Sequence, residues 1–118
     1  DLAFTIIEVN QFEPEGLEAI TEPMAELFTW TLKTSLGDKQ HRIRGMAASY
    51  LGILKHQPSI PLLIRALEDD HAHVRANAAL ALGRMRAQEA KAKLEEKTKE
   101  DWDQTVRSRS REALGRMP

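Results

Sequence analysis

Four histidines are the residues of this sequence best suited to holding a metal ion or acting as a base. The chain contains no cysteine, so thiolate ligation is excluded and histidine is the only nitrogen ligand for zinc. Three of the four precede segments of helical pattern, in expected turns, which predicts that they lie along one edge and do not converge. Two of them alone would make at most a two-ligand site, so we predict no metal and no cofactor. The four are His41, His56, His71 and His73.

Serine chemistry is also poorly supported. A serine hydroxyl becomes a nucleophile when a base lies within hydrogen-bond reach. Ser49, Ser108 and Ser110 lie instead among alanine and arginine in helical segments, with no histidine at helical spacing. We expect structural roles for these serines, and we predict that the protein is not an enzyme.

Arginine recurs at one position, as Arg44, Arg75 and Arg107. A repeated arginine could bind a ligand, because its planar fork holds a carboxylate through two hydrogen bonds. The same fork could instead pair with an acid in an adjacent turn and fix the stacking of the units, which is the interpretation that we favour. Candidate acids in those turns are Asp38, Asp70 and Asp103.

These arginines belong to a longer internal repeat. Residues 43–52 match residues 74–83 and 106–115, at shifts of 31 and 32 residues. Each copy begins with a β-branched residue and arginine and ends with Leu-Gly. A unit of this length is too small to bury its own apolar face, so the period indicates a solenoid in which neighbouring units complete one core.

Each unit is predicted to contain two helices. The matched segments form the second helix, where paired alanines let neighbouring helices approach closely. Residues 58–69 form the first helix of the middle unit, with Ser59 as a candidate cap and Pro61 in the first turn. A glycine near the end of each second helix either ends the helix or permits a close helix contact. These glycines are Gly52, Gly83 and Gly115.

The middle unit carries a recognisable family pattern. An acidic turn at Asp69-Asp70 is followed by Val74-Arg75, a pair of alanines, and Ala-Leu-Gly ending at Gly83. This pattern resembles the short HEAT-like repeats of the E-Z or phycobilisome-lyase type, over about residues 38–117. The resemblance implies an all-α fold, an α-solenoid of about three stacked antiparallel helix pairs. Proteins with such repeats include bilin lyase subunits, adaptors and metal-dependent hydroxylases. The hydroxylases use His-Glu dipeptides, and this sequence has none.

We treat the chain as one HEAT-like repeat domain. Residues 1–21 form an N-terminal segment, in which residues 1–12 have no assigned structure and a break is expected at residues 13–16. The first helix of the first unit is expected at residues 22–36, after a capping Thr21. The three repeats are assigned to residues 22–55, 58–86 and 87–117.

The last unit differs from the other two. Ser110-Arg111 replaces the paired alanines, and lysines and glutamates alternate along residues 89–100. A helix with charges on most sides belongs at a solvent boundary, as a terminal repeat requires. Trp102 in this unit could either plug the last interhelical turn or anchor a partner.

The outward side of the second helices is the remaining candidate for function. If Val74, Ala78 and Leu82 face the core, the opposite side of the helix carries Asn77, Leu80 and Arg84, at spacings of three and seven residues from Asn77. This row is apolar in the first unit and basic in the last, which favours a protein partner with acidic groups at the basic end. We predict a non-catalytic protein–protein interaction scaffold that binds its partner along the concave face. The predicted partner-binding residues are Met46, Ser49, Ile53, Asn77, Leu80, Arg84, Arg109, Glu112 and Arg116.

The charge distribution leaves other function classes open. Residues 1–38 carry eight acids and one lysine, a net charge of −7, whereas residues 39–118 carry +6. The basic part permits a nucleic-acid-binding array, as in HEAT-like DNA glycosylases. The overall charge of −1 and the lack of aromatic residues among the basic ones argue against it. Complementary charge could also pair two copies of the chain. A bilin-lyase-like accessory subunit is an alternative that the resemblance alone implies.

The composition is that of a globular protein of the cytoplasm. Hydrophobic residues make up 42% and charged residues 30% of the chain, and the lack of cysteine fits a reducing compartment. No apolar run approaches the ~20 residues that a membrane helix requires. The first ten residues also lack the basic start of a signal peptide. We therefore expect a cytoplasmic protein without a membrane segment.

Overall fold

Three antiparallel helix pairs make up the described part of the chain. The structure is a computed structural model that describes residues 14–34 and 40–118, without the side chains of residues 14–21 and 34. Within these ranges the chain is helical and contains no strand, which confirms the predicted all-α solenoid. Short 3-10 helices, η2 and η3, precede α4 and α6. The elements are α2 (Pro14–Thr34), α3 (His41–Leu54), η2 (Gln57–Ser59), α4 (Ile60–Ala66), α5 (Ala72–Arg84), η3 (Gln88–Ala90), α6 (Lys91–Glu100) and α7 (Gln104–Gly115).

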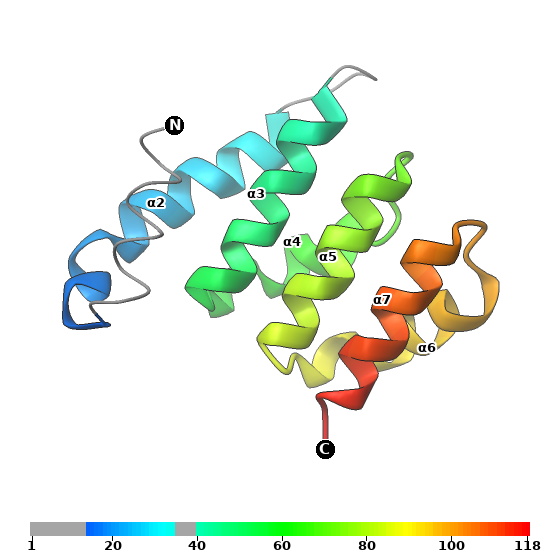
Figure 1. Cartoon of the computed structure of the whole chain (residues 1–118). Coiled ribbons are helices and arrows are strands. Elements are labelled where there is room, and N and C mark those ends of the chain that lie inside the picture. The colour runs from blue at the N-terminus through cyan, green and yellow to red at the C-terminus, as the bar shows by residue number, and fades with distance from the viewer. Residues whose placement is uncertain (1–13, 35–39) are drawn as a thin grey trace.

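The helices form two layers. The second helices of the three units, α3, α5 and α7, lie side by side, with α4 and α6 behind them (Figure 1). The side chains of α5 that were expected to face the core do so, since Val74, Ala78 and Leu82 are fully buried. Leu51, Leu63 and other leucines from each layer join the same core. The helical phase inferred from the repeat is therefore confirmed.

The first helix differs from the expected one at its start. α2 begins at Pro14, so residues 14–16 belong to a helix, while the segment 1–12 that was expected to end there lies outside the described residues. Proline is well suited to the first turn of a helix, because the N–H that it lacks would have no partner there. The predicted start at Thr21 is also wrong, since Pro23 lies at an exposed position inside α2. The expected end of this helix at residue 36 and the unassigned residues 1–12 lie outside the described residues.

The first helix of the middle unit begins almost as predicted. Pro61 lies in the first turn of α4, as expected. The Ser59 side chain does not cap the helix, because its hydroxyl is hydrogen-bonded to Nδ1 of His56. The predicted capping role of Ser59 is therefore wrong.

Glycine permits close contact between the second helices. A Cβ on Gly52 would lie 2.5 Å from the Cα of Ala81, and one on Gly83 would lie 2.8 Å from the Cα of Ala113. The backbones of α3, α5 and α7 therefore approach closely, which selects one of the two predicted roles for these glycines. Lys55 and Arg86 adopt the left-handed conformation after the helices, with φ of 53° and 50°.

Arginine links successive units, as the structural interpretation predicted. Arg44 donates from Nε and Nη2 to the two carboxylate oxygens of Asp69, at 3.0 Å each. Arg75 makes the same fork to Asp101, at 2.9 and 3.2 Å. Burial by itself would raise the pKa of both carboxyls, but the arginine forks and a backbone N–H outweigh it and lower both pKa values. Each fork joins the second helix of one unit to the interhelical turn of the next.

The acids in these forks are not the predicted ones. Asp70 is exposed, and Asp103 caps α7 by accepting a hydrogen bond from the N–H of Val106 at 3.0 Å. Asp38 lies outside the described residues. The third arginine, Arg107, donates to the backbone oxygen of Asp101 at 2.7 Å.

Candidate partner-binding face

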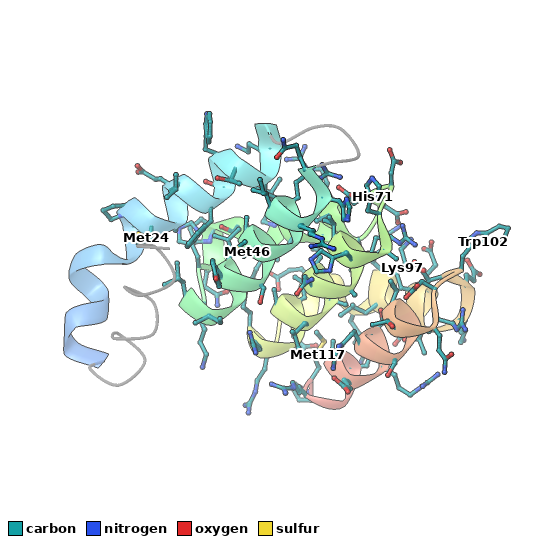
Figure 2. All side chains as sticks on the ribbon, turned by 45° about the horizontal axis from the view of Figure 1, so that its top comes forward. Met24, Met46, His71, Lys97, Trp102 and Met117 are labelled. Atoms are coloured by element: carbon teal, nitrogen blue, oxygen red, sulfur yellow. The ribbon has the colours of Figure 1, made fainter. Side chains whose placement is uncertain are left out.

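The nine predicted partner-binding residues lie on one side of α3, α5 and α7, and we call this side the open face. None of them is buried, although the residues on the opposite side of α5 are. The apolar part is on α3, where Met46 is 40% exposed (Figure 2). Arg109 and Glu112 on α7 and Arg116 directly after it are exposed, and the remaining five residues are partly exposed. The structure therefore places the whole row on accessible surface.

Two shallow grooves run between the second helices. The first has a volume of about 670 Å³ and lies between α3 and α5, with Met46, Ser49 and Asn77 in its lining. The second has a volume of about 380 Å³ and lies between α5 and α7, where Asn77, Leu80 and Arg109 contribute. Asn77 is common to both grooves, so the row follows the two helix contacts across the array.

A third groove lies at the carboxyl ends of the same helices, and we call it the basic groove. Its volume is about 860 Å³. Its lining includes the predicted partner-binding residues Ile53, Arg84 and Arg116. Eight of the nine predicted residues therefore line one of the three grooves. The ninth, Glu112, forms an ion pair with Arg109 at 3.1 Å. The full lining of the basic groove is Gly52, Ile53, Lys55, Gly83, Arg84, Met85, Arg86, Gly115 and Arg116.

Several lining residues were not predicted from the sequence. Tyr50 and Arg42 line the first groove, and Lys55 and Arg86 line the basic groove. Lys55 and Arg86 each follow Leu-Gly by three residues, in units 31 residues apart. The repeat register could therefore have identified them, whereas nothing in the repeat indicates Arg42.

Three of the histidines come together, contrary to the prediction that they are strung along one edge. The His41 ring stacks on His71 with centroids 4.5 Å apart, and His73 meets it edge-on at 6.1 Å. Gly45 admits the His73 ring, because a Cβ there would lie 2.5 Å from ring atom Cδ2. Burial, followed by the charges of His41 and Arg42, lowers the pKa of His73.

This histidine cluster has no arrangement that suits a metal. Among residues 14–34 and 40–118, no group of three or more histidine, cysteine or acidic side chains could hold an ion. The fourth histidine, His56, lies apart and contacts Glu22, with 3.2 Å between Nε2 and Oε1. The cluster therefore provides ring stacking, together with a lowered pKa at His73.

The remaining candidates have simple placements. Ser110 is buried and Ser49 is partly buried, and no histidine is bonded to either in the described part of the chain. Trp102 is 97% exposed and projects from the molecule (Figure 2). It does not plug the interhelical turn, so that predicted role is wrong, and contact with a partner stays a prediction.

Family comparison agrees with this geometry. Residues 30–115 match the family model for HEAT repeats. The chain belongs to the HEAT-repeat family. The match is to HEAT repeats in general and does not distinguish the phycobilisome-lyase type.

HEAT repeats are generally protein-interaction scaffolds. No curated protein matches the chain closely enough to suggest a partner. No helix in the described ranges of this HEAT array is long and apolar enough to cross a membrane.

Proposed function

We propose that this HEAT array is a non-catalytic scaffold that holds a protein partner along the open face. One observation supports the proposal most directly. The second helices are buried on one side by a continuous core, and on the other they expose an apolar residue, Met46, beside grooves that cross all three units. An exposed apolar side chain beside polar grooves is a common feature of protein-binding surfaces.

The alternative proposal is binding of nucleic acid along the same face. Arg84, Arg86 and Arg116 favour it, because phosphate neutralisation supplies most non-specific affinity for nucleic acid. The lining of the basic groove contains no aromatic side chain on which bases could stack. A net charge of −1 also opposes long-range attraction of a polyanion. We therefore place protein binding first, and the absence of cysteine supports a cytoplasmic location for it.

Affinity capture with matched surface variants tests the proposal. Met46→Asp introduces a charge on the open face, and Leu27→Asp introduces one on α2, where Leu27 has a similar exposure of 47%. The tagged domain is used to capture proteins from native lysate, and a thermal melt checks that each variant is folded. We expect Met46→Asp to lose the captured protein and Leu27→Asp to keep it. Equal capture by both variants, or equal loss, would contradict an interface on the open face.

A further inference from the structure

The basic groove gathers four cationic side chains without any acid. Its lining includes Lys55 from the end of α3, Arg84 and Arg86 from the end of α5, and Arg116 from the end of α7. All three units thus contribute positive charge to one surface depression. Carboxyl ends of helices carry a partial negative charge, which stabilises cations there in the absence of any ligand.

The four cations of the basic groove lack the carboxylate partners that several other basic residues of the array have. Arg75, Lys97 and Arg109 each pair with a carboxylate inside the array. Within the part of the chain that the structure describes, no ion pair involves any of the four cations of the basic groove. The groove therefore presents positive charge that the array itself does not neutralise.

Arg84 supplies an independent observation. Its Nη1 atom is buried and has no hydrogen-bond acceptor among residues 14–34 and 40–118. A buried charged donor without an acceptor is costly, and such groups normally find an oxygen. Arg84 as a whole is partly exposed and lines the groove, so a ligand oxygen that enters the groove can approach its guanidinium, whose Nη1 atom is covered in the free protein.

The floor of the basic groove leaves room for a backbone. Gly115 is exposed in the lining and a Cβ on it would meet nothing within 4 Å, whereas Gly52 and Gly83 are buried against Ala81 and Ala113. Ile53 and Met85 add apolar surface to the lining. A peptide can use both features, since its backbone can approach Gly115 and its apolar side chains can contact Ile53 and Met85. A nucleic acid would gain little there, because the lining has no aromatic platform for its bases.

We propose that the basic groove binds an acidic peptide segment of the partner protein, whose carboxylates are held by Arg84, Arg116 and the neighbouring cations. This inference rests on the proposed scaffold function, and it names the chemistry of the partner at one end of the open face. Arginine forks bind carboxylates through two parallel hydrogen bonds, which gives the groove a preference for Asp and Glu side chains.

Fluorescence anisotropy with a labelled octaglutamate peptide tests the inference directly. Gly115→Glu adds an acid to the groove, and Gly115→Ala is its matched control, because a methyl group there meets no atom. Arg84→Gln removes the partly buried guanidinium, and Arg111→Gln removes an exposed charge on α7 that does not line the groove. A urea melt checks the folding of every variant.

We expect saturable binding of the peptide by the wild-type domain. Arg84→Gln should weaken it by about tenfold or more, the effect of losing one charged hydrogen bond. Gly115→Glu should weaken it to a similar degree, because the new carboxylate repels those of the peptide. Gly115→Ala and Arg111→Gln should stay within about twofold at physiological salt, where distant charges are screened. Absence of saturable binding, or equal weakening by Arg111→Gln and Arg84→Gln, would overturn the inference.

Two further measurements separate the alternatives. In the first, an oligothymidylate of equal length is added as a competitor of the labelled peptide. If the oligonucleotide binds more tightly than the peptide, the ligand of the basic groove is nucleic acid and the inference is wrong. Met46→Asp lies outside the basic groove and should leave octaglutamate affinity unchanged while it abolishes partner capture. If Met46→Asp abolishes capture but the peptide does not bind, only the basic-groove inference fails. If the peptide binds but Met46→Asp retains the partner, the proposed scaffold function fails instead.

Discussion

Substitution of two equivalent glycines by alanine should give opposite effects on stability. In Gly52→Ala the new Cβ would lie 2.5 Å from the Cα and 2.6 Å from the Cβ of Ala81. Both atoms belong to a short residue on the facing helix, so relief requires α3 and α5 to separate. In Gly115→Ala the new methyl group meets no atom within 4 Å. The two variants therefore add the same group to equivalent repeat positions with different surroundings.

The magnitude follows from two opposing terms. Replacing glycine by alanine favours a helix by up to about 1 kcal/mol. Forcing one methyl group into a packed contact costs about 1–3 kcal/mol, and displacement of a backbone lies toward the upper end. Gly52→Ala should therefore lower the free energy of unfolding by about 1–2 kcal/mol, whereas Gly115→Ala should leave it unchanged or raise it by a few tenths.

Equilibrium urea denaturation followed by circular dichroism measures both variants. The midpoint of unfolding should fall for Gly52→Ala and stay constant or rise for Gly115→Ala, with the same slope of free energy against urea. If Gly52→Ala were as stable as Gly115→Ala, the close approach of α3 and α5 would be wrong. Gly83→Ala serves as a second test, because its Cβ would lie 2.8 Å from the Cα of Ala113.

The remaining predictions concern the ion pairs, the core and an exposed side chain. Because the pKa values of Asp69 and Asp101 are lowered in the folded state, their contribution to stability is present above their ordinary pKa of 3.8 and is lost as pH falls below it. Asp101→Asn should lower stability at neutral pH and reduce the further loss at acid pH, as urea midpoints measured across that range would show. Leu82→Ala should cost about 2–5 kcal/mol, since Leu82 is fully buried in the central helix. Trp102→Ala should change stability by less than about 0.5 kcal/mol, because its side chain is almost wholly exposed. A large effect of Trp102→Ala in the same melts would contradict its projection into solvent.

The helical phase could be read from the sequence because the repeat specifies it three times. Helical spacing places Val74, Ala78 and Leu82 on one face even when the predicted helix ends are slightly wrong. Their apolar side chains then predict that this face is buried, as it is. The row on the opposite side is then fixed by geometry. Asn77 lines two grooves at once. The sequence does not predict this, because the grooves depend on how α5 packs between α3 and α7.

The arginine partners were predicted in kind but not in position. Asp69 and Asp101 accept the N–H of the residue two positions later, at 2.9 Å each, and this turn holds their carboxylates toward the preceding unit. Asp103 lies only two residues after Asp101 but caps α7 instead. The choice between neighbouring aspartates is made by turn geometry, and the repeat pattern contains no information on it.

The histidine cluster was missed for a related reason. His41 and His71 occupy similar turns 30 residues apart, and the sequence places them on the same edge without giving the distance between units. The absence of a side chain on Gly45 lets the His73 ring pack against α3. Contacts between units depend on the separation of the helices, which is set by small residues rather than by the histidines themselves.

The two ends of the described array differ in a way that bears on self-association. Ile43 is 42% exposed, whereas the equivalent residues of the next two units, Val74 and Val106, are fully buried. At the other end Arg111 is exposed, at the position where Ala79 is fully buried in the unit before it. Stacking of another unit on α7 would bury an arginine where the array elsewhere accepts only a methyl group, and burial of an unpaired charge is costly. End-to-end stacking on α7 is therefore disfavoured.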